Sequence, residues 1–422
     1  MVRLALFLHI YQPPTQDPSI LEDIVQASYF PLIELLEAYS TASITLNIPA
    51  SLTIQLADDY PELVETVKNL VSKGQIELTG SAAYHPLLFN TPKKEIYRQI
   101  RLNEEINKEI WGNCWQPCGF FPPELAVDQQ VLEVVEDCGY NWALLEDAYS
   151  RQISCKGGVA KREGGDLKVV FRNKSLSLKI AFAKITTVDN LLATLHENPP
   201  QISVNPPQIR ENPILCLDGE TFGWHQPSQL NLLEQLFALS SESEMKNGNL
   251  RLYTVTEIIE DFPPGLEVKI GKSSWGKRME EGEQIYYPRW EDPNNEIHQM
   301  QWELTDLAIE AVRNSQFKIL SDKLNENLKI ENSAQKQWLK ARHLLDKALH
   351  SDQYFWAEGK HVWHLGMVEK GVKMLRDVVV TVPDANEKTK QEARSLYQEI
   401  VDLGVDLHGE GIVEEGGVEF GT

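Results

Sequence analysis

The sequence lacks the features that mark several classes of protein. It has five cysteines, an odd number without a Cys-x-x-Cys pair, so neither a disulfide framework nor a structural zinc site is predicted. Basic residues are also scarce, because 40 Lys and Arg stand against 62 Asp and Glu and leave a net charge of -22. This deficit of positive charge argues against a nucleic-acid partner or an anionic membrane surface. A neutral substrate fits better.

Long apolar runs are absent as well. The run Leu4–Leu8 is too short for a signal peptide and no small-residue cleavage site follows it, and no later stretch reaches membrane-spanning length. We therefore expect a cytoplasmic protein. The length of 422 residues predicts one large domain with an appendage, or two domains.

Strand-like and helix-like segments alternate through the first 262 residues. Apolar runs predict strands at residues 2–8, 43–48, 75–80, 119–126, 142–147, 214–217 and 250–255. Helical spacing of apolar residues lies between them, at 30–39, 51–71, 92–111, 127–137, 189–195 and 230–239. Alternating pieces at 167–171 and 176–182 predict a hairpin-like insertion or paired strands. About seven strand-helix alternations are typical of a closed parallel barrel or a doubly wound sheet.

The remainder of the chain follows a different pattern. Phe262-Pro263-Pro264-Gly265 interrupts the alternation, and helical spacing resumes near residue 297. We predict a catalytic barrel domain over residues 1–262, an irregular linker at the rim of the active site over 263–295, an all-helical domain over 296–408, and an acidic, Gly-rich tail over 409–422.

Carboxylates stand at the ends of two of the predicted strands in settings that fix them. Glu124 comes directly after Pro122-Pro123, and Asp218 ends the strand 214–217. In an α/β barrel the carboxyl ends of the strands carry the catalytic residues. One of the two acids can attack an anomeric carbon while the other moves a proton to and from the glycosidic oxygen, although acids at strand ends also bind metals.

Other polar and aromatic residues gather at the same predicted strand ends. They are candidates for substrate contacts: His9, Gln12, Glu220, Trp224 and His225. Glu77 lies inside an apolar strand, where it either faces the barrel mouth, which we favour, or braces a neighbouring loop. Trp275 and Trp290, in the irregular stretch, are sugar platforms or packing residues.

Four of these segments, in order, resemble the signature regions of family 57 glycoside hydrolases. They are His9-Ile-Tyr-Gln12-Pro13, Gly74-Gln-Ile-Glu77-Leu, Phe121-Pro-Pro-Glu124-Leu-Ala126 and Leu217-Asp218-Gly-Glu220-Thr-Phe-Gly223. The segment Ser351-Asp352-Gln-Tyr-Phe-Trp356 also resembles a substrate-contacting stretch of that family. The resemblance implies a distorted (β/α)7 barrel followed by a helical domain.

The same resemblance implies retaining action on α-glucans. Glu124 matches the nucleophile of the family and Asp218 its general acid/base, while His9, Gln12, Glu77, Glu220, Asp352 and Trp356 match positions near the sugar. No cofactor and no metal site are implied. Family members include α-amylases, 4-α-glucanotransferases, branching enzymes and α-galactosidases, and the motifs do not choose among them.

The sequence also departs from the family pattern. Ile10-Tyr11 separates His9 from Gln12, and Trp224-His225 stands where two histidines are often found. We also expect no β-sandwich after the helical domain, unlike in the longer family members. Two alternatives stay open besides this family: a carbohydrate-binding protein that has lost turnover, against which the presence of both Glu124 and Asp218 argues, and a metal-dependent polysaccharide deacetylase. The latter requires a His-x3–5-His pair at a strand end, which is absent from the first 260 residues.

Overall fold

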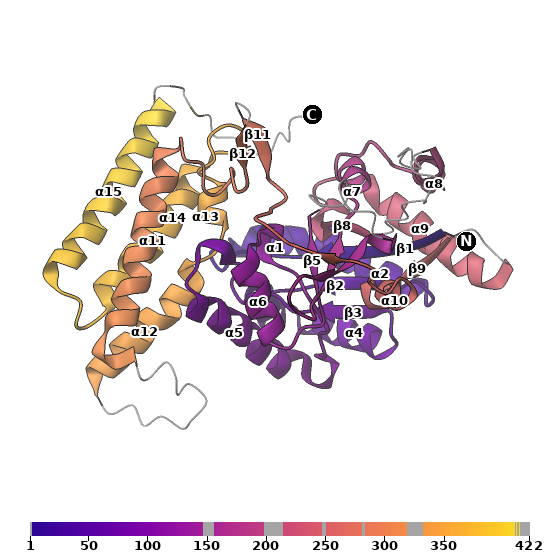
Figure 1. Cartoon of the computed structure of the whole chain (residues 1–422), viewed down its shortest axis with the longest axis horizontal. Helices are drawn as coiled ribbons and strands as arrows, with labels where there is room; N and C mark the ends of the chain where they lie inside the picture. Colours follow the sequence, from indigo (N-terminus) through magenta and orange to yellow (C-terminus); the bar gives the residue numbers. More distant parts are fainter. Residues whose placement is uncertain are drawn as a thin grey trace. The chain divides into compact units, whose positions relative to one another are not determined.

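The computed structural model describes residues 2–146, 156–197, 214–246, 250–280, 283–318, 332–409, 411 and 413. The chain forms two compact units. One comprises residues 1–83 and 88–275, and the other comprises residues 84–87 and 276–422 (Figure 1). The first unit thus extends beyond the boundary that we predicted at residue 262. Asp147 of the predicted strand 142–147 and the loop after it, and the predicted tail except Gly409, Gly411 and Val413, lie outside the described residues.

Seven parallel strands of the described chain build the first unit. They are β1 (Val2–His9), β2 (Ile44–Asn47), β3 (Ile76–Thr79), β4 (Gly119–Phe120), β5 (Trp142–Leu145), β7 (Lys168–Phe171) and β8 (Ile214–Asp218). Regular pairing joins β3, β2, β1 and β8 in one sheet and β4, β5 and β7 in another. A parallel bridge between Gly80 and Phe120 joins the two sheets.

The circle of strands closes between β7 and β8. Asn173, just past β7, donates its backbone N–H to the carbonyl of Ile214 at 2.7 Å. Three further strands flank the barrel: β6 (Val159–Arg162), β9 (Leu250–Tyr253) and β10 (Glu267–Val268). β6 runs antiparallel to β7, which confirms a hairpin in this region, and β10 pairs with β6. The pairing of β10 explains why the first unit continues past residue 262.

The helices of this unit cover the strands. They are α1 (Pro18–Ile24), a π-helical turn (Val25–Tyr29), α2 (Phe30–Ala38), α3 (Ala50–Asp59), α4 (Pro61–Ser72), α5 (Lys93–Trp111), α6 (Gln129–Asp137), α7 (Lys174–Ala181), α8 (Val188–Glu197), α9 (Gln229–Lys246) and α10 (Val255–Asp261). Among these helices and those of the second unit, the described residues include none that is both long and apolar enough to span a membrane.

Two of the sequence-based predictions were wrong in detail. Residues 176–181 belong to helix α7 rather than to a strand, and Phe182 is its C-cap. The side chain of Asn173 caps the start of this helix by accepting from the N–H of Leu176. The single helix predicted at 51–71 is broken at Tyr60, and Pro61 begins the second helix, α4.

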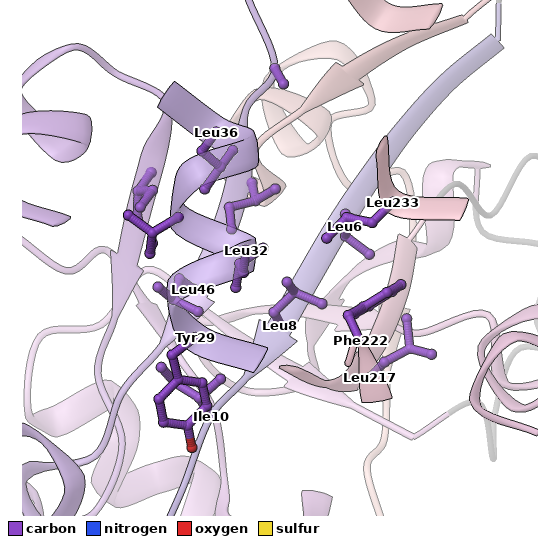
Figure 2. Close-up of a cluster of buried hydrophobic side chains, with 14 of the residues drawn as sticks. Leu6, Leu8, Ile10, Tyr29, Leu32, Leu36, Leu46, Leu217, Phe222 and Leu233 are labelled. Atoms are coloured by element: carbon purple, nitrogen blue, oxygen red, sulfur yellow. The ribbon is translucent and has the colours of Figure 1, made fainter. Parts of the chain in front are cut away.

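Side chains of β1 alternate between two hydrophobic cores. Leu4, Leu6 and Leu8 pack with the covering helices. Figure 2 shows Leu6 and Leu8 of this face together with Leu32 and Leu36 of α2. The alternate residues Ala5 and Phe7 face the barrel interior together with Trp142 and Cys216. This period of two is what a strand buried on both faces requires. It also directs His9, the last residue of β1, to the interior side.

The second unit is mainly helical. Its elements are β11 (Arg278–Glu280), β12 (Glu283–Ile285), α11 (Glu296–Asn314), α12 (Ser333–Ala348), α13 (Asp352–Phe355), α14 (Leu365–Thr381) and α15 (Glu387–Gly409). Apolar faces of α11, α12, α14 and α15 share one core, in which Trp338 is 1% exposed.

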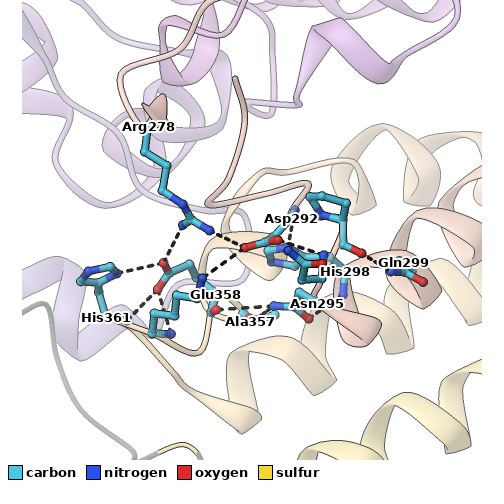
Figure 3. Close-up of polar contacts among 11 residues, drawn as sticks. Arg278, Asp292, Asn295, His298, Gln299, Ala357, Glu358 and His361 are labelled. Atoms are coloured by element: carbon cyan, nitrogen blue, oxygen red, sulfur yellow. Dashed lines mark hydrogen bonds and ion pairs between the residues drawn. The ribbon is translucent and has the colours of Figure 1, made fainter. Parts of the chain in front are cut away.

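A network of ion pairs and hydrogen bonds ties the irregular stretch before α11 to the segment after α13 (Figure 3). Arg278 donates to the carboxylate of Asp292 at 2.6 Å and lies 3.9 Å from that of Glu358. Nδ1 of His361 lies 2.9 Å from the same oxygen, Oε1 of Glu358. Trp290, in the same stretch, is fully buried and is therefore a packing residue of this unit.

Candidate active site

A row of polar residues crosses the carboxyl ends of neighbouring strands. His9 is paired in register with Asp218 on one side and with Asn47 on the other, and Asn47 is paired with Thr79. The Nδ1 atom of His9 and Oδ1 of Asn47 are 2.8 Å apart. The structure thus brings His9 and Asp218 together at one edge of the barrel, as their strand-end positions predicted.

His9 also connects this edge to the segment after β4. Its ring stacks on Phe121 with a centroid distance of 4.3 Å, and Phe121 stacks in turn on Phe7 at 5.4 Å. Phe121 lies three residues before Glu124. Through His9, the strand end that carries Asp218 is therefore linked to the segment that carries Glu124.

Glu124 occupies an unusual backbone conformation. Only Gly119 and Phe120 of the predicted strand 119–126 form a strand, and residues 123–125 form a single 3-10 turn. Within this turn the backbone of Glu124 has φ 59° and ψ 17°. These angles lie in the left-handed region, which residues other than glycine rarely adopt. Such strained positions persist only where the surroundings fix them, and they concentrate at functional sites.

Trp275 contacts the carboxylate of Glu124 directly. Its indole Nε1–H donates to Oε2 of Glu124 at 2.6 Å. Glu124 and Trp275 lie 151 residues apart in the chain, and nothing in the local sequence of either predicts this contact. The sequence indicated only that Trp275 is a sugar platform or a packing residue.

Asp218 and Glu220 follow the same strand, but their environments are opposite. The side chain of Asp218 is exposed at the end of β8, whereas Glu220 is buried. Oε1 of Glu220 accepts from the hydroxyl of Tyr29, from the backbone N–H of Tyr11 at 3.2 Å and from Nε2 of Gln12 at 3.2 Å.

The buried position of Glu220 has an electrostatic consequence. Burial, reinforced by the charge of Asp218, raises the pKa of Glu220 to about 7. Burial and the neighbouring Glu220 also raise the pKa of the Tyr29 hydroxyl, which therefore remains a donor. Gln12 is thus placed next to Glu220 by the structure, and Tyr29, in the π-helical turn, is a member of the site that sequence reasoning missed.

Trp224 and His225 lie on the loop that follows Glu220. Gly223 permits this loop, because its φ is 107° and a Cβ atom there would lie 1.9 Å from the carbonyl oxygen of Ala27. Trp224, at 39% exposed, and His225 are both exposed residues. Partial desolvation of the His225 ring lowers its pKa, and the charge of Asp218 opposes this effect. His225 is therefore largely neutral at pH 7.

Glu77 lies deeper than the residues at the strand ends. It is paired in register with Thr45, two residues before the row of Asn47 and Thr79. Its carboxylate accepts from the hydroxyl of Thr45 at 2.7 Å and from both the hydroxyl and the backbone N–H of Thr256, at the start of α10. This arrangement matches the bracing alternative, in which Glu77 fixes a neighbouring segment.

Asp352 and Trp356 belong to the second unit. Nδ1 of the buried His350 lies 3.1 Å from Oδ2 of Asp352. Trp356, one helical turn further on, packs edge-on against the ring of His364 with centroids 5.7 Å apart. Within that unit the two predicted substrate residues are thus side by side on α13 and its C-terminal cap.

The described residues include no group of three or more His, Cys, Asp or Glu side chains arranged to hold a metal ion. The side chains gathered at the candidate site are carboxylates, imidazoles, amides and aromatic rings. Carboxylates in contrasting environments beside aromatic rings can carry out acid–base and nucleophilic chemistry on a carbohydrate.

The fold and these strand-end acids define an α/β barrel with a two-carboxylate candidate active site. Residues 5–271 match the sequence profile of glycosyl hydrolase family 57. The chain belongs to this family.

The chain is similar to several characterised relatives. It is 25% identical over 273 residues to an α-amylase of Pyrococcus furiosus and 24% identical over 279 residues to a 4-α-glucanotransferase of Thermococcus kodakarensis. These alignments cover 61% and 63% of this chain but only 39% and 40% of the relatives, so the chain spans about two fifths of their length.

Solved structures share the fold over much more of the chain. A family 57 branching enzyme of Pyrococcus horikoshii superposes with a TM-score of 0.68 and 14% identity, covering 98% of this chain and 97% of that one. The 4-α-glucanotransferase of Thermococcus litoralis gives a TM-score of 0.64 and 16% identity, covering 90% and 59%. The (β/α)7 barrel with a following helical region is thus confirmed.

Proposed function

We propose that this protein is a retaining glycoside hydrolase or transglycosidase that acts on α-glucans. Glu124 is the nucleophile and Asp218 the general acid/base. The observation that carries the proposal is the double role of His9, which is paired with Asp218 and stacks on Phe121 three residues before Glu124. Relatives that are named α-amylase and 4-α-glucanotransferase support the substrate class.

The reaction has two displacements. Glu124 attacks the anomeric carbon, the bond from that carbon to the glycosidic oxygen breaks, and the proton of Asp218 passes to the leaving oxygen. Asp218 then takes a proton from water or from a sugar hydroxyl, whose oxygen attacks the anomeric carbon and releases Glu124 as a carboxylate. Water gives hydrolysis, and a sugar hydroxyl gives transfer.

Substrate contacts come from the residues around the two acids. We assign His9, Gln12, Trp224 and His225 to the sugar site of the barrel, with Glu220 as the group that orders Gln12. Asp352 and Trp356 form a carbohydrate contact of the helical unit. Glu77 acts as a brace. The partner is an oligo- or polysaccharide, no cofactor takes part, and the location is cytoplasmic.

The test is incubation of the purified chain with amylose and with maltooligosaccharides of defined length, while reducing ends and product lengths are followed by chromatography. New reducing ends that depend on Glu124 and Asp218 identify a hydrolase. Redistribution of chain lengths at a constant number of reducing ends identifies a transferase. A chain that binds these sugars without any turnover is instead a carbohydrate-binding protein, and the proposal is then wrong.

The deacetylase alternative is less well supported, because the chain belongs to family 57. Release of acetate from an acetylated oligosaccharide in the presence of Zn²⁺ would be the observation in its favour.

A further inference from the structure

The segment Ser273–Trp275 is attached to the segment around Glu124 by backbone hydrogen bonds. Val127 and Ser273 form an antiparallel bridge, in which each backbone N–H donates to the other's carbonyl at 2.9 and 3.0 Å. The backbone N–H of Trp275 also donates to the carbonyl of Glu124 at 3.3 Å. The indole N–H completes the contact at Oε2 of the carboxylate, at 2.6 Å. Trp275 thus holds Glu124 by both its backbone and its side chain.

A second set of contacts holds Trp275 in place. Nζ of Lys174 donates to the carbonyl of Trp275 at 3.3 Å and lies 3.9 Å from the buried carboxylate of Glu146. Arg172 binds the same oxygen of Glu146 through Nε at 3.1 Å and Nη2 at 2.7 Å. Arg172 also donates to the carbonyl of Cys216, two residues before Asp218, at 3.3 Å. Buried ion pairs of this kind fix geometry, because displacing either partner leaves an uncompensated charge.

We propose that Trp275 is a positioning residue for the nucleophile and that its indole N–H assists the second displacement. This inference rests on the proposed function and deepens it. With Oε2 held by the indole, Oε1 is the oxygen that forms the bond to the anomeric carbon. The orientation of the carboxylate is therefore set before substrate binds. In the first displacement this advantage is offset, because the hydrogen bond weakens as the carboxylate becomes a neutral ester.

The hydrogen bond changes in strength during the reaction. In the glycosyl-enzyme intermediate Glu124 is an ester, and Oε2 is its neutral carbonyl oxygen. When the incoming oxygen attacks the anomeric carbon, the bond from that carbon to Oε1 breaks and its electron pair returns to Glu124 as carboxylate charge. A hydrogen bond to a charged acceptor is stronger than one to a neutral acceptor. The indole N–H therefore stabilises the transition state of deglycosylation more than the intermediate.

The experiment uses Trp275→Phe, which keeps an aromatic ring but removes the N–H donor. The substrate is an aryl α-maltoside with a good leaving group, so that formation of the intermediate is fast. We expect deglycosylation to slow by about 10- to 100-fold, the range given by one hydrogen bond to a charged group. Rapid-quench mass spectrometry should show the enzyme accumulating with one covalently attached glycosyl group. Both kcat and KM should fall, and kcat/KM should change less than about threefold.

A matched control is Trp115→Phe. The indole of Trp115 donates to Oε2 of Glu104 at 2.7 Å, in the same unit and with similar geometry, but it precedes the amino end of β4. This variant should show no accumulation of intermediate. Lys174→Met keeps the indole but removes the hydrogen bond from Lys174 to the carbonyl of Trp275. By weakening the contact between Trp275 and Glu124, it should raise the amount of accumulated intermediate at least about threefold.

The outcomes separate the inference from the proposed function. A wild-type chain that is inactive on α-glucans, or active without Glu124, overturns the proposed function. If turnover requires Glu124 but Trp275→Phe and Lys174→Met lower kcat/KM without accumulation of intermediate, or behave like Trp115→Phe, the proposed function stands and the role of Trp275 is wrong. Thermal unfolding of each variant shows whether it is folded. If Trp275→Phe does not fold, the result with Lys174→Met tests the role of Trp275.

Discussion

Asp218 and Glu220 stand two residues apart at the end of β8, one exposed and the other 5% exposed. Because burial and the charge of Asp218 raise the pKa of Glu220 to about 7, Glu220 carries a proton through most of the mildly acidic range. The two carboxyl groups can therefore sit close together without both being ionised at pH values below about 7.

This relationship predicts a pH-dependent effect of Glu220→Gln on stability. The folded-state pKa of Glu220 lies above the value of 4.5 for an unperturbed group, so its contribution to stability is complete below about pH 4.5 and is lost as the pH rises through about 7. An amide at residue 220 keeps an oxygen for the bonds from Tyr29, Gln12 and Tyr11 but cannot ionise. The stability of the variant relative to wild type should therefore rise by about 2 kcal/mol between pH 5 and pH 8.

The measurement is urea unfolding of both proteins across that pH range. Glu133→Gln, which replaces a carboxylate at the surface of α6, serves as the matched control. A stability difference between Glu220→Gln and wild type that stays constant from pH 5 to pH 8 would contradict the proposed protonation of Glu220.

Replacing Glu124 by Gln should abolish turnover without abolishing binding. The amide has nearly the same shape but is a far weaker nucleophile, so we expect kcat on maltooligosaccharides to fall at least about 10⁴-fold. Affinity for the same sugars, measured by calorimetry, should stay within about threefold because most sugar contacts are unaffected. Glu133→Gln is again the control, and a Glu124→Gln variant with activity near wild type would remove Glu124 from its assigned role.

The left-handed backbone of Glu124 predicts that glycine at this position is at least as stable as alanine, the reverse of the usual order. Both Glu124→Gly and Glu124→Ala remove the side chain and its bond to Trp275, but only alanine retains a Cβ that is strained at φ 59°. The left-handed conformation costs a residue with a Cβ about 1–2 kcal/mol. Glycine also gives the unfolded chain more conformational freedom, which lowers the stability of the glycine variant by about 0.4–1 kcal/mol and cancels part of this difference. The glycine variant should still be at least as stable as the alanine variant.

Denaturant unfolding of the two Glu124 variants tests this order. The same pair of substitutions at Glu105, in the middle of α5, should give the usual order, with alanine more stable by about 1 kcal/mol. If the alanine variant is clearly more stable than the glycine variant at both positions, the left-handed backbone of Glu124 stores no strain.

The close packing around Gly80 predicts that a side chain added at the junction between the two sheets lowers the stability of the protein. Gly80 bridges to Phe120, and a Cβ atom at this position would lie 2.0 Å from the hydroxyl oxygen of Tyr140. Gly80→Ala must displace Tyr140, whose hydroxyl is bonded to Glu104. We expect a loss of about 1–3 kcal/mol in the free energy of unfolding, as for other overpacked cores. Gly265→Ala, with no atom within 4 Å of the added Cβ, should change stability by less than about 0.5 kcal/mol. Equal effects of the two substitutions would contradict this account of the junction.

The sequence by itself determined the strand framework and the position of both acids along it. Val2–His9 and Ile214–Asp218 are apolar runs that end at polar residues, so their strands and ends could be predicted from local composition. The order of the four motifs determined the family, which the match over residues 5–271 confirms. The roles assigned to Glu124 and Asp218 remain predictions.

Only the tertiary structure decided how the acids are held. The contact of Trp275 with Glu124, the stacking of His9 on Phe121 and the bond from Tyr29 to Glu220 join residues that are 151, 112 and 191 positions apart. No local periodicity records such pairs, because a barrel brings them together only when its strands close. The same reason explains Glu77, since its partner Thr256 reaches it only after α10 has packed into the barrel.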